Sequence, residues 1–217
     1  MPSARFGATR RSWKSPRGSG ALDRALTVAA VAYYAAVIGF TILVRSGDLS
    51  ASGIDSSADE LAEGQVLRLL TSGIAVEGPL AVPQIALGAF VAAVVIRRER
   101  AALWWVAALV GHVGSALISY AIIGLASALG SSAAEDAAND PDYGISGVLG
   151  ASLGALFASG LRAGDRMITG FGVAAFVGLL PFSLGWLDIE HPVAFGLGAA
   201  VVLRIGSTDP VALRRQR

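Results

Sequence analysis

The sequence predicts an all-α polytopic membrane protein with six transmembrane helices and both ends on the cytoplasmic side. Of its 217 residues, 54% are hydrophobic and 15% are charged, whereas soluble domains carry about a quarter charged residues. The apolar residues fall in long uncharged blocks without a two-residue alternation. Because only helices and closed barrels satisfy their backbone in lipid, these blocks predict membrane-spanning helices.

The chain begins with a basic segment, residues 1–24, which we expect to be a disordered cytoplasmic tail. The uncharged run 25–44 follows, and at 1.5 Å per residue it spans about 30 Å, the thickness of the hydrocarbon layer. A signal-peptide core is shorter, about 7–15 residues, so the run predicts a retained first helix. The predicted membrane domain covers 25–206, and a second basic tail covers 207–217.

Five further apolar segments follow the first predicted helix. The block 101–134 is too long for one span, and its end at 124–134, rich in Gly, Ala and Ser, is expected to leave the membrane. The last block, 189–203, is the weakest. With these adjustments, the six predicted helices cover residues 25–45, 79–96, 101–124, 144–162, 167–186 and 189–205.

The loop between the first two predicted helices, residues 46–78, is long. Its second half places apolar residues among charged ones, namely Leu61, Val66, Leu67, Leu69 and Leu70. This pattern fits a short helix lying on the outer membrane surface, and it fits a solvated loop equally well.

The orientation follows from the distribution of positive charge, because cytoplasmic loops carry an excess of Lys and Arg. With the N-terminus inside, only Arg45 and Arg68 fall outside, which leaves 15 of the 17 basic residues inside. The outer loops are acidic and hold Asp55, Asp59, Glu60, Glu63, Asp136, Asp140 and Asp142. Abundant Ala, Gly and Arg with almost no Lys is typical of a GC-rich bacterial genome, so we expect a multi-pass protein of a bacterial plasma membrane.

The absence of cysteine excludes disulfides and thiolate metal sites. No cofactor, no metal ion and no nucleic-acid partner is part of the leading expectation. The lipid bilayer is the expected surrounding of the chain.

The string Gly144-Ile145-Ser146-Gly147 lies at the outer end of the fourth predicted helix. In a chain with 27 glycines a G-x-S-G string arises readily by chance. Val148 also departs from the G-x-S-x-G turn of soluble hydrolases. Alone, the string therefore favours a small residue in a close helix contact over a nucleophile.

His191 lies at the outer end of the sixth predicted helix. An ionisable residue at membrane depth is a functional candidate, and the alternative is a histidine in water at the interface. If Arg204 and Arg162 mark the inner boundary, the helical rise puts His191 about 10 Å and Ser146 about 6 Å below the outer boundary. Both groups are therefore predicted to be submerged at similar depth on the same side.

A serine hydroxyl is a weak nucleophile until a base takes its proton, and neutral imidazole does this at physiological pH. Small residues at four-residue spacing would let the fourth and sixth helices approach closely enough for such a pair, although generic packing uses the same residues. These residues are Gly150, Gly154 and Ala158 after Ser146, the parallel row Gly147, Ala151 and Ala155, and Ala194 and Gly198 on the sixth helix. Asp188 and Glu190 are expected to face the loop, which leaves no obvious third acid.

His112 lies midway along the third predicted helix and is expected to face the bundle interior. Three roles are open for it: an oxyanion donor, a structural hydrogen-bonding residue, or part of a metal site with His191. Ser115 and Ser119 on the same helix are weaker candidate donors. Trp104 and Trp105 are expected to anchor this helix near the inner interface.

Over about residues 60–205 the sequence resembles the rhomboid family of intramembrane serine proteases. The string ending in Ser146-Gly147 resembles the nucleophile motif of that family, and His191 with Ala194 and Gly198 resembles its last-helix pattern. Arg68 to Ser72 resembles the segment leading into its second helix. The resemblance implies a six-helix rhomboid-like bundle, Ser146 as the nucleophile, His191 as the base, and transmembrane proteins cleaved near their outer ends as substrates.

Three positions differ from the family pattern. The segment Leu80 to Ile85 replaces the family's His-x-x-x-Asn motif, which helps bind the oxyanion, and Gln84 is its one candidate donor. Gly150 stands where an aromatic residue is expected, and Leu67 where a tryptophan is expected. The resemblance therefore implies one of two proteins. The first is an active protease supported by Gln84, His112 and the glycines Gly144 and Gly147. The second is an inactive rhomboid-like protein that binds membrane-protein clients.

Overall fold

The chain folds into a bundle of helices. The computed structural model describes residues 20–50, 54–74, 76, 78–143, 145–179 and 186–207. Within these ranges there is no strand, and extended pairing is limited to an isolated bridge between Ser56 and Asp142. The all-α class predicted from the sequence is therefore confirmed for this part of the chain.

Four helices are long and apolar enough to cross a membrane, namely α1 (Gly20–Ser46), α4 (Ala81–Glu99), α5 (Ala101–Ala128) and α7 (Ile145–Ala163). Two further helices complete the bundle, α8 (Arg166–Leu179) and α9 (Glu190–Ser207). With 14 residues α8 is about 21 Å long, less than the hydrocarbon thickness. Each of the six predicted segments overlaps one of these helices, but the bounds differ at their ends.

The predicted and observed bounds differ at the start of the first helix and in the segment before the last helix. The first helix already begins at Gly20, so residues 20–24 belong to α1 and not to a tail, and the Asp23 carboxylate accepts a hydrogen bond from the backbone N–H of Ala101 at 2.9 Å. Near the other end, Trp186–Ile189 forms a separate 3₁₀ turn, η3, before α9 and is not the end of the fifth helix. The remaining parts of both predicted tails, and Gly144, lie outside the described residues.

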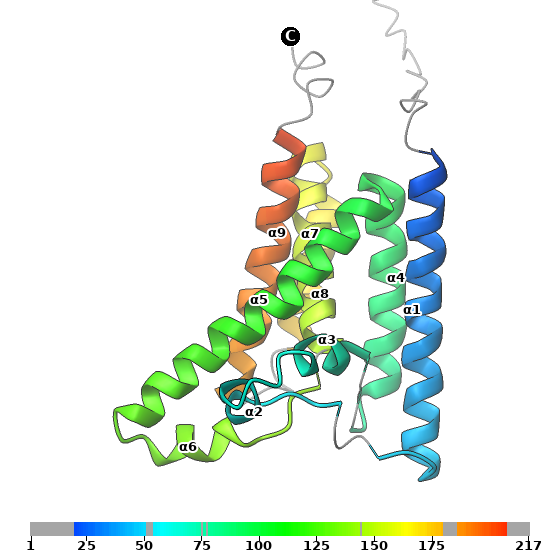
Figure 1. The fold of residues 1–217 in the computed structure, drawn as a ribbon. Coiled ribbons are helices and arrows are strands. Elements are labelled where there is room, and N and C mark those ends of the chain that lie inside the picture. The colour runs from blue at the N-terminus through cyan, green and yellow to red at the C-terminus, as the bar shows by residue number, and fades with distance from the viewer. Residues whose placement is uncertain are drawn as a thin grey trace, which may run out of the picture.

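The bundle has two chemically different ends (Figure 1). The start of α1, the α4–α5 and α7–α8 connections and the end of α9 lie at one end, called here the basic end, which carries Arg97, Arg98, Arg100, Arg162, Arg166 and Arg204. The opposite end, called here the loop end, holds α2 (Ala58–Ala62), α3 (Arg68–Thr71), η1 (Ser72–Ile74) and α6 (Ser132–Ala138). The arginines of the predicted inner loops that the structure describes are thus gathered at one end of the bundle.

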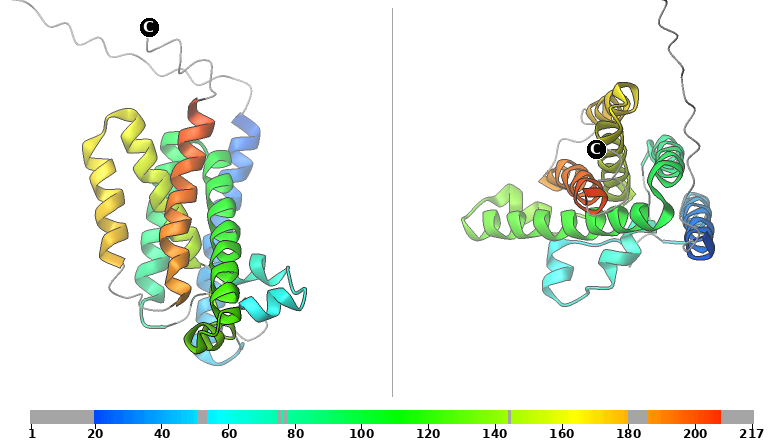
Figure 2. Two further views of the ribbon diagram at one scale, coloured as in Figure 1. Left: turned by 90° about the vertical axis from the view of Figure 1, so that its left-hand side faces the viewer. Right: turned by 90° about the horizontal axis from the view of Figure 1, so that it is seen from above.

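Helix α7 is the central helix of the bundle. It packs against α4, α5, α8 and α9. In α7, 78% of an apolar stretch of 18 residues is buried inside the bundle, compared with 22% of the corresponding stretch in α1. Helix α5 crosses the bundle obliquely, with α2 and α3 on one side and α7, α8 and α9 on the other (Figure 2). Residues near the start of α7 are therefore enclosed by several elements at the loop end.

The outer surface of the bundle is apolar, as lipid contact requires. A helix on the surface of a soluble protein instead turns a polar stripe outward. The exposed apolar side chains include Val28, Val31 and Ile42 on α1, Phe90 on α4, Val106, Leu109, Val110 and Leu117 on α5, and Val173 and Val177 on α8. Together with the four candidate spans, this surface indicates a membrane protein.

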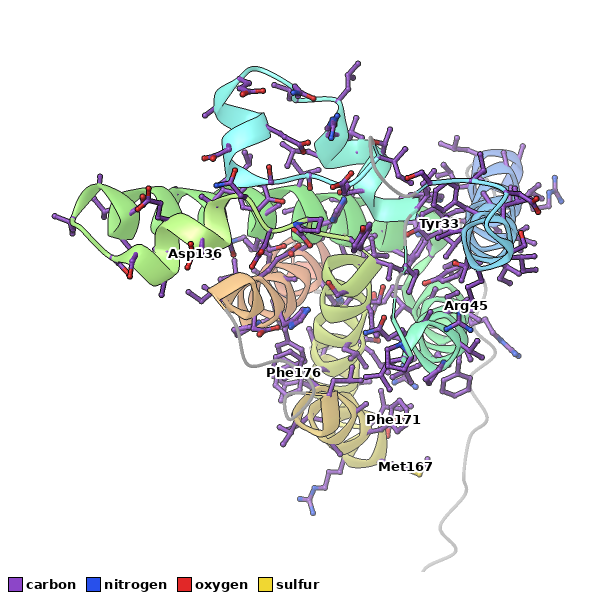
Figure 3. All side chains as sticks on the ribbon, turned by 90° about the horizontal axis from the view of Figure 1, so that it is seen from below. Tyr33, Arg45, Asp136, Met167, Phe171 and Phe176 are labelled. Carbon is purple, nitrogen blue, oxygen red and sulfur yellow. The ribbon has the colours of Figure 1, made fainter. Side chains whose placement is uncertain are left out.

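Aromatic side chains connect the outer helices to the core. The ring of Phe176 on α8 lies 4.6 Å from that of Phe195 on α9, and Phe171 turns to the other side, with its ring 6.0 Å from that of Phe90 on α4 (Figure 3). Trp104 is fully buried, and its indole N–H donates to Ser152 Oγ at 3.0 Å. The expectation that Trp104 anchors α5 at the membrane interface is therefore wrong, because this side chain packs against α7.

The long loop after α1 forms short helices between α1 and α4. Ser57 caps α2 by accepting a hydrogen bond from the backbone N–H of Glu60 at 3.2 Å. Arg68 pairs with Glu60 and, at 3.7 Å, with Asp55. Leu69 is buried, and it contacts α5 residues in a small apolar cluster. The described part of this loop therefore covers one side of α5 at the loop end.

Candidate functional site

Ser146 lies in the first turn of α7, at the loop end of the bundle. Its side chain is half-buried, between the buried residues Ile145 and Gly147. Within the described part of the chain, no hydrogen bond or ion pair of the Ser146 hydroxyl occurs.

The relation between α7 and α9 fixes which part of α9 lies level with Ser146. The two helices run side by side in the same direction (Figure 1). A methyl group on Gly154 would lie 1.9 Å from the carbonyl oxygen of Phe195, and one on Gly150 would lie 3.2 Å from that of His191. A step of four residues on α7 thus corresponds to a step of four on α9. One turn before Gly150, Ser146 is level with the turn that precedes His191.

Glycine and alanine make the close approach of α7 and α9 possible. A methyl group on Gly198 would lie 2.0 Å from the carbonyl oxygen of Ala151, a separation that no Cβ atom can adopt. Ala194 is fully buried in the same contact, with its Cβ 3.2 Å from the position of a methyl group on Gly150. Several of the small residues singled out in the sequence, namely Gly150, Ala151, Gly154, Ala194 and Gly198, therefore lie where the two helices meet.

His191 has a carboxylate partner in the turn before it. The Nδ1 atom of His191 lies 3.5 Å from Oδ1 of Asp188, which belongs to η3. The His191 side chain is 22% exposed and the Asp188 side chain is 27% exposed, so both are mostly buried but remain partly accessible from outside the bundle. A histidine held in this way has one ring nitrogen beside an acid and the other, Nε2, directed elsewhere.

Glu190 faces the bundle interior, and the expectation that it faces the loop is wrong. Its side chain is 2% exposed, and its Oε1 accepts a hydrogen bond from Ser115 Oγ at 3.0 Å. The same oxygen lies 4.0 Å from Nδ1 of His112. A methyl group on Gly147 would lie 2.5 Å from it, so a side chain at this position would displace the Glu190 carboxylate. Glu190 thus binds the start of α9 to α5, beside the first turn of α7.

His112 is buried in the middle of this polar group. It is 3% exposed, and neither ring nitrogen has a hydrogen-bond partner among the described residues. A methyl group on Gly73 would lie 3.0 Å from Nε2, and one on Gly147 would lie 3.3 Å from Nδ1. The imidazole therefore fills the space between η1 and the first turn of α7, directly beside the residue that follows Ser146.

A second set of polar side chains joins the loop after α1 to α5 and to the segment before α7. The Tyr120 hydroxyl donates to Asp142 Oδ2 at 2.9 Å and lies 2.8 Å from Ser56 Oγ. Ser56 Oγ donates to Ser72 Oγ at 3.2 Å. Ser119 is fully buried nearby in sequence, and its Oγ has no partner within the described residues. These bonds fix the segment that leads into the first turn of α7.

The remaining candidates are not joined to Ser146 by described interactions. Gln84 lies half-buried in the first turn of α4, and no hydrogen bond in the described ranges connects its side chain to Ser146, His112 or His191. No group of three or more His, Cys, Asp or Glu side chains that could hold a metal ion occurs among the described residues.

Sequence reasoning missed the carboxylates Asp188, Glu190 and Asp142 as members of this site. A signal was available for Glu190, because an acidic residue in the first turn of an apolar helix is itself an ionisable group near membrane depth. No sequence signal indicates that Asp142 meets Tyr120, because 22 residues and two turns separate them.

Comparisons with known proteins add no relative. No protein-family model matches the chain, and searches of the curated proteins and of the solved structures find no match. The function must therefore be inferred from the residues of this chain and their arrangement.

Proposed function

We propose that this protein is an intramembrane serine endopeptidase of the rhomboid type, in which Ser146 is the nucleophile and His191 the general base. The observation that supports this best is the register of α7 and α9, which makes Ser146 level with the turn before His191. Helical side chains lean toward the N-terminus of their helix. The His191 ring therefore leans from its own backbone toward the level of Ser146.

The proposed reaction is hydrolysis of a peptide bond through an acyl-enzyme. His191 accepts the proton of the Ser146 hydroxyl as the oxygen attacks the scissile carbonyl, and then gives that proton to the leaving amine. A water molecule next attacks the ester with His191 again as the base, which releases the acid and restores Ser146. The proposed substrates are transmembrane proteins cleaved near the end of the bilayer at which Ser146 lies.

The proposal includes six membrane spans, α1, α4, α5, α7, α8 and α9, in a bacterial plasma membrane. The basic end is proposed to be cytoplasmic, which follows the preference of Lys and Arg for that side. Two observations support this orientation. The start of α1 and the end of α9 both lie at the basic end, and the loops at the opposite end are acidic.

An inactive rhomboid-like protein that binds membrane-protein clients is the second candidate. The observation that favours it is the segment Leu80 to Ile85, which lacks the family's oxyanion motif and whose one candidate donor, Gln84, makes no hydrogen bond to Ser146 within the described residues. One oxyanion donor is typically worth about 10²–10³ in rate. Without such donors the same fold would bind a client but leave its peptide bonds intact.

A cleavage assay with two proteins separates these candidates. The wild type and Ser146→Ala are reconstituted in liposomes with a labile transmembrane substrate, and the products are compared by gel and mass spectrometry. The protease produces a fragment that Ser146→Ala does not produce. Equal product from both proteins, or no product from either while both retain the substrate, contradicts the protease.

A further inference from the structure

We infer that Asp188 is a positioning residue for His191, so that the site works as a Ser146–His191–Asp188 triad and not as a dyad. This inference rests on the proposed roles of Ser146 and His191. It concerns a residue that neither the serine motif nor the last-helix pattern contains. Its basis is the contact between Asp188 and His191 at the junction of η3 and α9.

The geometry of the pair is local and is set by the backbone. Asp188 and His191 are three residues apart, and η3 leads directly into α9, so the two side chains share one side of the junction. The distance of 3.5 Å between Oδ1 and Nδ1 is longer than a tight hydrogen bond. Catalytic hydrogen bonds are often long without substrate and shorten when it binds.

The contact determines which ring nitrogen can act as the base. A carboxylate beside Nδ1 keeps the proton on that nitrogen, so the lone pair is on Nε2. Nε2 is then the atom that takes the proton from Ser146. The carboxylate also stabilises the imidazolium that forms during the attack, without itself taking the proton.

The other neighbouring carboxylate cannot do this work. Glu190 precedes His191 directly, but its carboxyl group is turned into the interior, where Ser115 and His112 surround it. The two acids that flank the histidine therefore have different roles. Glu190 joins α9 to the core, and Asp188 orients the imidazole.

The test compares Asp188→Asn with Asp136→Asn in proteoliposomes with a transmembrane peptide substrate. Asp136 is an exposed residue of α6 at the same end of the bundle (Figure 3), so its substitution removes the same charge without touching the site. Asp188→Asn should lower kcat by about 10–10²-fold, less than the about 10⁴-fold effect at a deeply buried triad acid, because this pair is partly exposed. KM should stay within about twofold, and Asp136→Asn should equal the wild type.

Asp188→Glu is the second variant, because it keeps a carboxylate within reach of Nδ1. It should retain at least about a tenth of the wild-type kcat while Asp188→Asn retains less, an order that follows from the need for a negative charge. Thermal unfolding of each variant checks that it is folded, and if Asp188→Asn does not fold, Asp188→Ser takes its place as the neutral variant.

The outcomes separate the inference from the proposed function. Full activity of folded Asp188→Asn, or equal loss in Asp188→Glu and Asp188→Asn, overturns the triad while Ser146-dependent cleavage by the wild type stands. An equal loss in Asp136→Asn also overturns it, because the effect is then one of overall charge. A wild type that cleaves no better than Ser146→Ala overturns the proposed function and the triad with it.

Discussion

At the scale of single residues, Glu190 brings a carboxylate into the contact between the starts of α7 and α9. Its Oε1 atom accepts a hydrogen bond from the Ser115 hydroxyl and lies close to Gly147. A buried acceptor of this kind fixes a helix end more sharply than apolar packing does, because a lost partner leaves a polar group unpaired. The residue next to it is His191, so the position of the proposed base depends on this contact.

Glu190→Ala should therefore lower the free energy of unfolding by about 1–3 kcal/mol, because the buried Ser115 hydroxyl then keeps only the backbone carbonyl of His112 as an acceptor and the contact between α9 and α5 is lost. Glu190→Gln should lower it less, because the side-chain carbonyl oxygen still accepts that bond. The measurement is reversible unfolding in mixed micelles, followed by circular dichroism. An Ala variant as stable as the wild type would contradict the role given to Glu190.

His112 and Gln84 are the two candidate side-chain donors for the oxyanion of the proposed reaction. His112 lies beside Gly147, the residue after Ser146, and Gln84 lies in the first turn of α4. In an active protease, His112→Ala or Gln84→Ala should slow cleavage by about 10–10³-fold, because one such donor is worth about 1.4–4 kcal/mol. Initial rates in liposomes measure this. Ser146-dependent cleavage that survives both changes would assign the oxyanion to backbone N–H groups.

At the scale of elements, the packing of α7 on α9 sets the register on which the proposed site depends. The helices touch through backbone atoms, as the position of Gly198 against the carbonyl oxygen of Ala151 demonstrates. Larger residues would separate the helices and shift the level of His191 relative to Ser146. The site therefore depends on glycines that have no chemical role.

Gly198→Ala should destabilise the bundle by about 1–3 kcal/mol, the usual effect of overpacking. Gly196→Ala is the matched control on the same helix, because no atom lies within 4 Å of the position that its methyl group would occupy. Unfolding of both variants in micelles provides the comparison. If Gly198→Ala is no less stable than Gly196→Ala, the close contact between α7 and α9 is not present.

Long uncharged blocks without a two-residue alternation predict the helices, because only helices and closed barrels satisfy their backbone in lipid. Their ends were harder to predict. The fifth predicted helix covers 167–186, and α8 agrees with it as far as Leu179, while residues 180–185 lie outside the described residues. Trp186 belongs to η3, and apolarity alone does not indicate where that 3₁₀ turn begins.

Within the candidate site, the sequence offered Ser146 and His191, because a motif and a lone ionisable residue are visible without coordinates. The inward direction of Glu190 depends on the rotation of α9 about its axis, which composition does not determine. The contact of Asp188 with His191 depends on the 3₁₀ turn of η3, for which no sequence signal was recognised.

At the scale of the whole molecule, the separation of charge between the two ends predicts its orientation. Reporter fusions at Glu99, at the basic end, and at Asp140, at the loop end, should report opposite sides of the membrane, with Glu99 cytoplasmic. Alkaline phosphatase and a cytoplasmic reporter, each fused at both positions, provide the measurement and its control. Signals from one side only would rule out the six-span arrangement.

The central claim is that Ser146 is a nucleophile activated by His191. The most direct measurement is labelling of the reconstituted protein by a fluorophosphonate probe, with the modified residue identified by mass spectrometry. We predict covalent labelling of Ser146 in the wild type, none in Ser146→Ala, and labelling slowed by at least about 10²-fold in His191→Ala, since a general base contributes about 10²–10⁴-fold. A wild type that is not labelled at Ser146, or labelling at Ser146 that is as fast in His191→Ala, would contradict the claim.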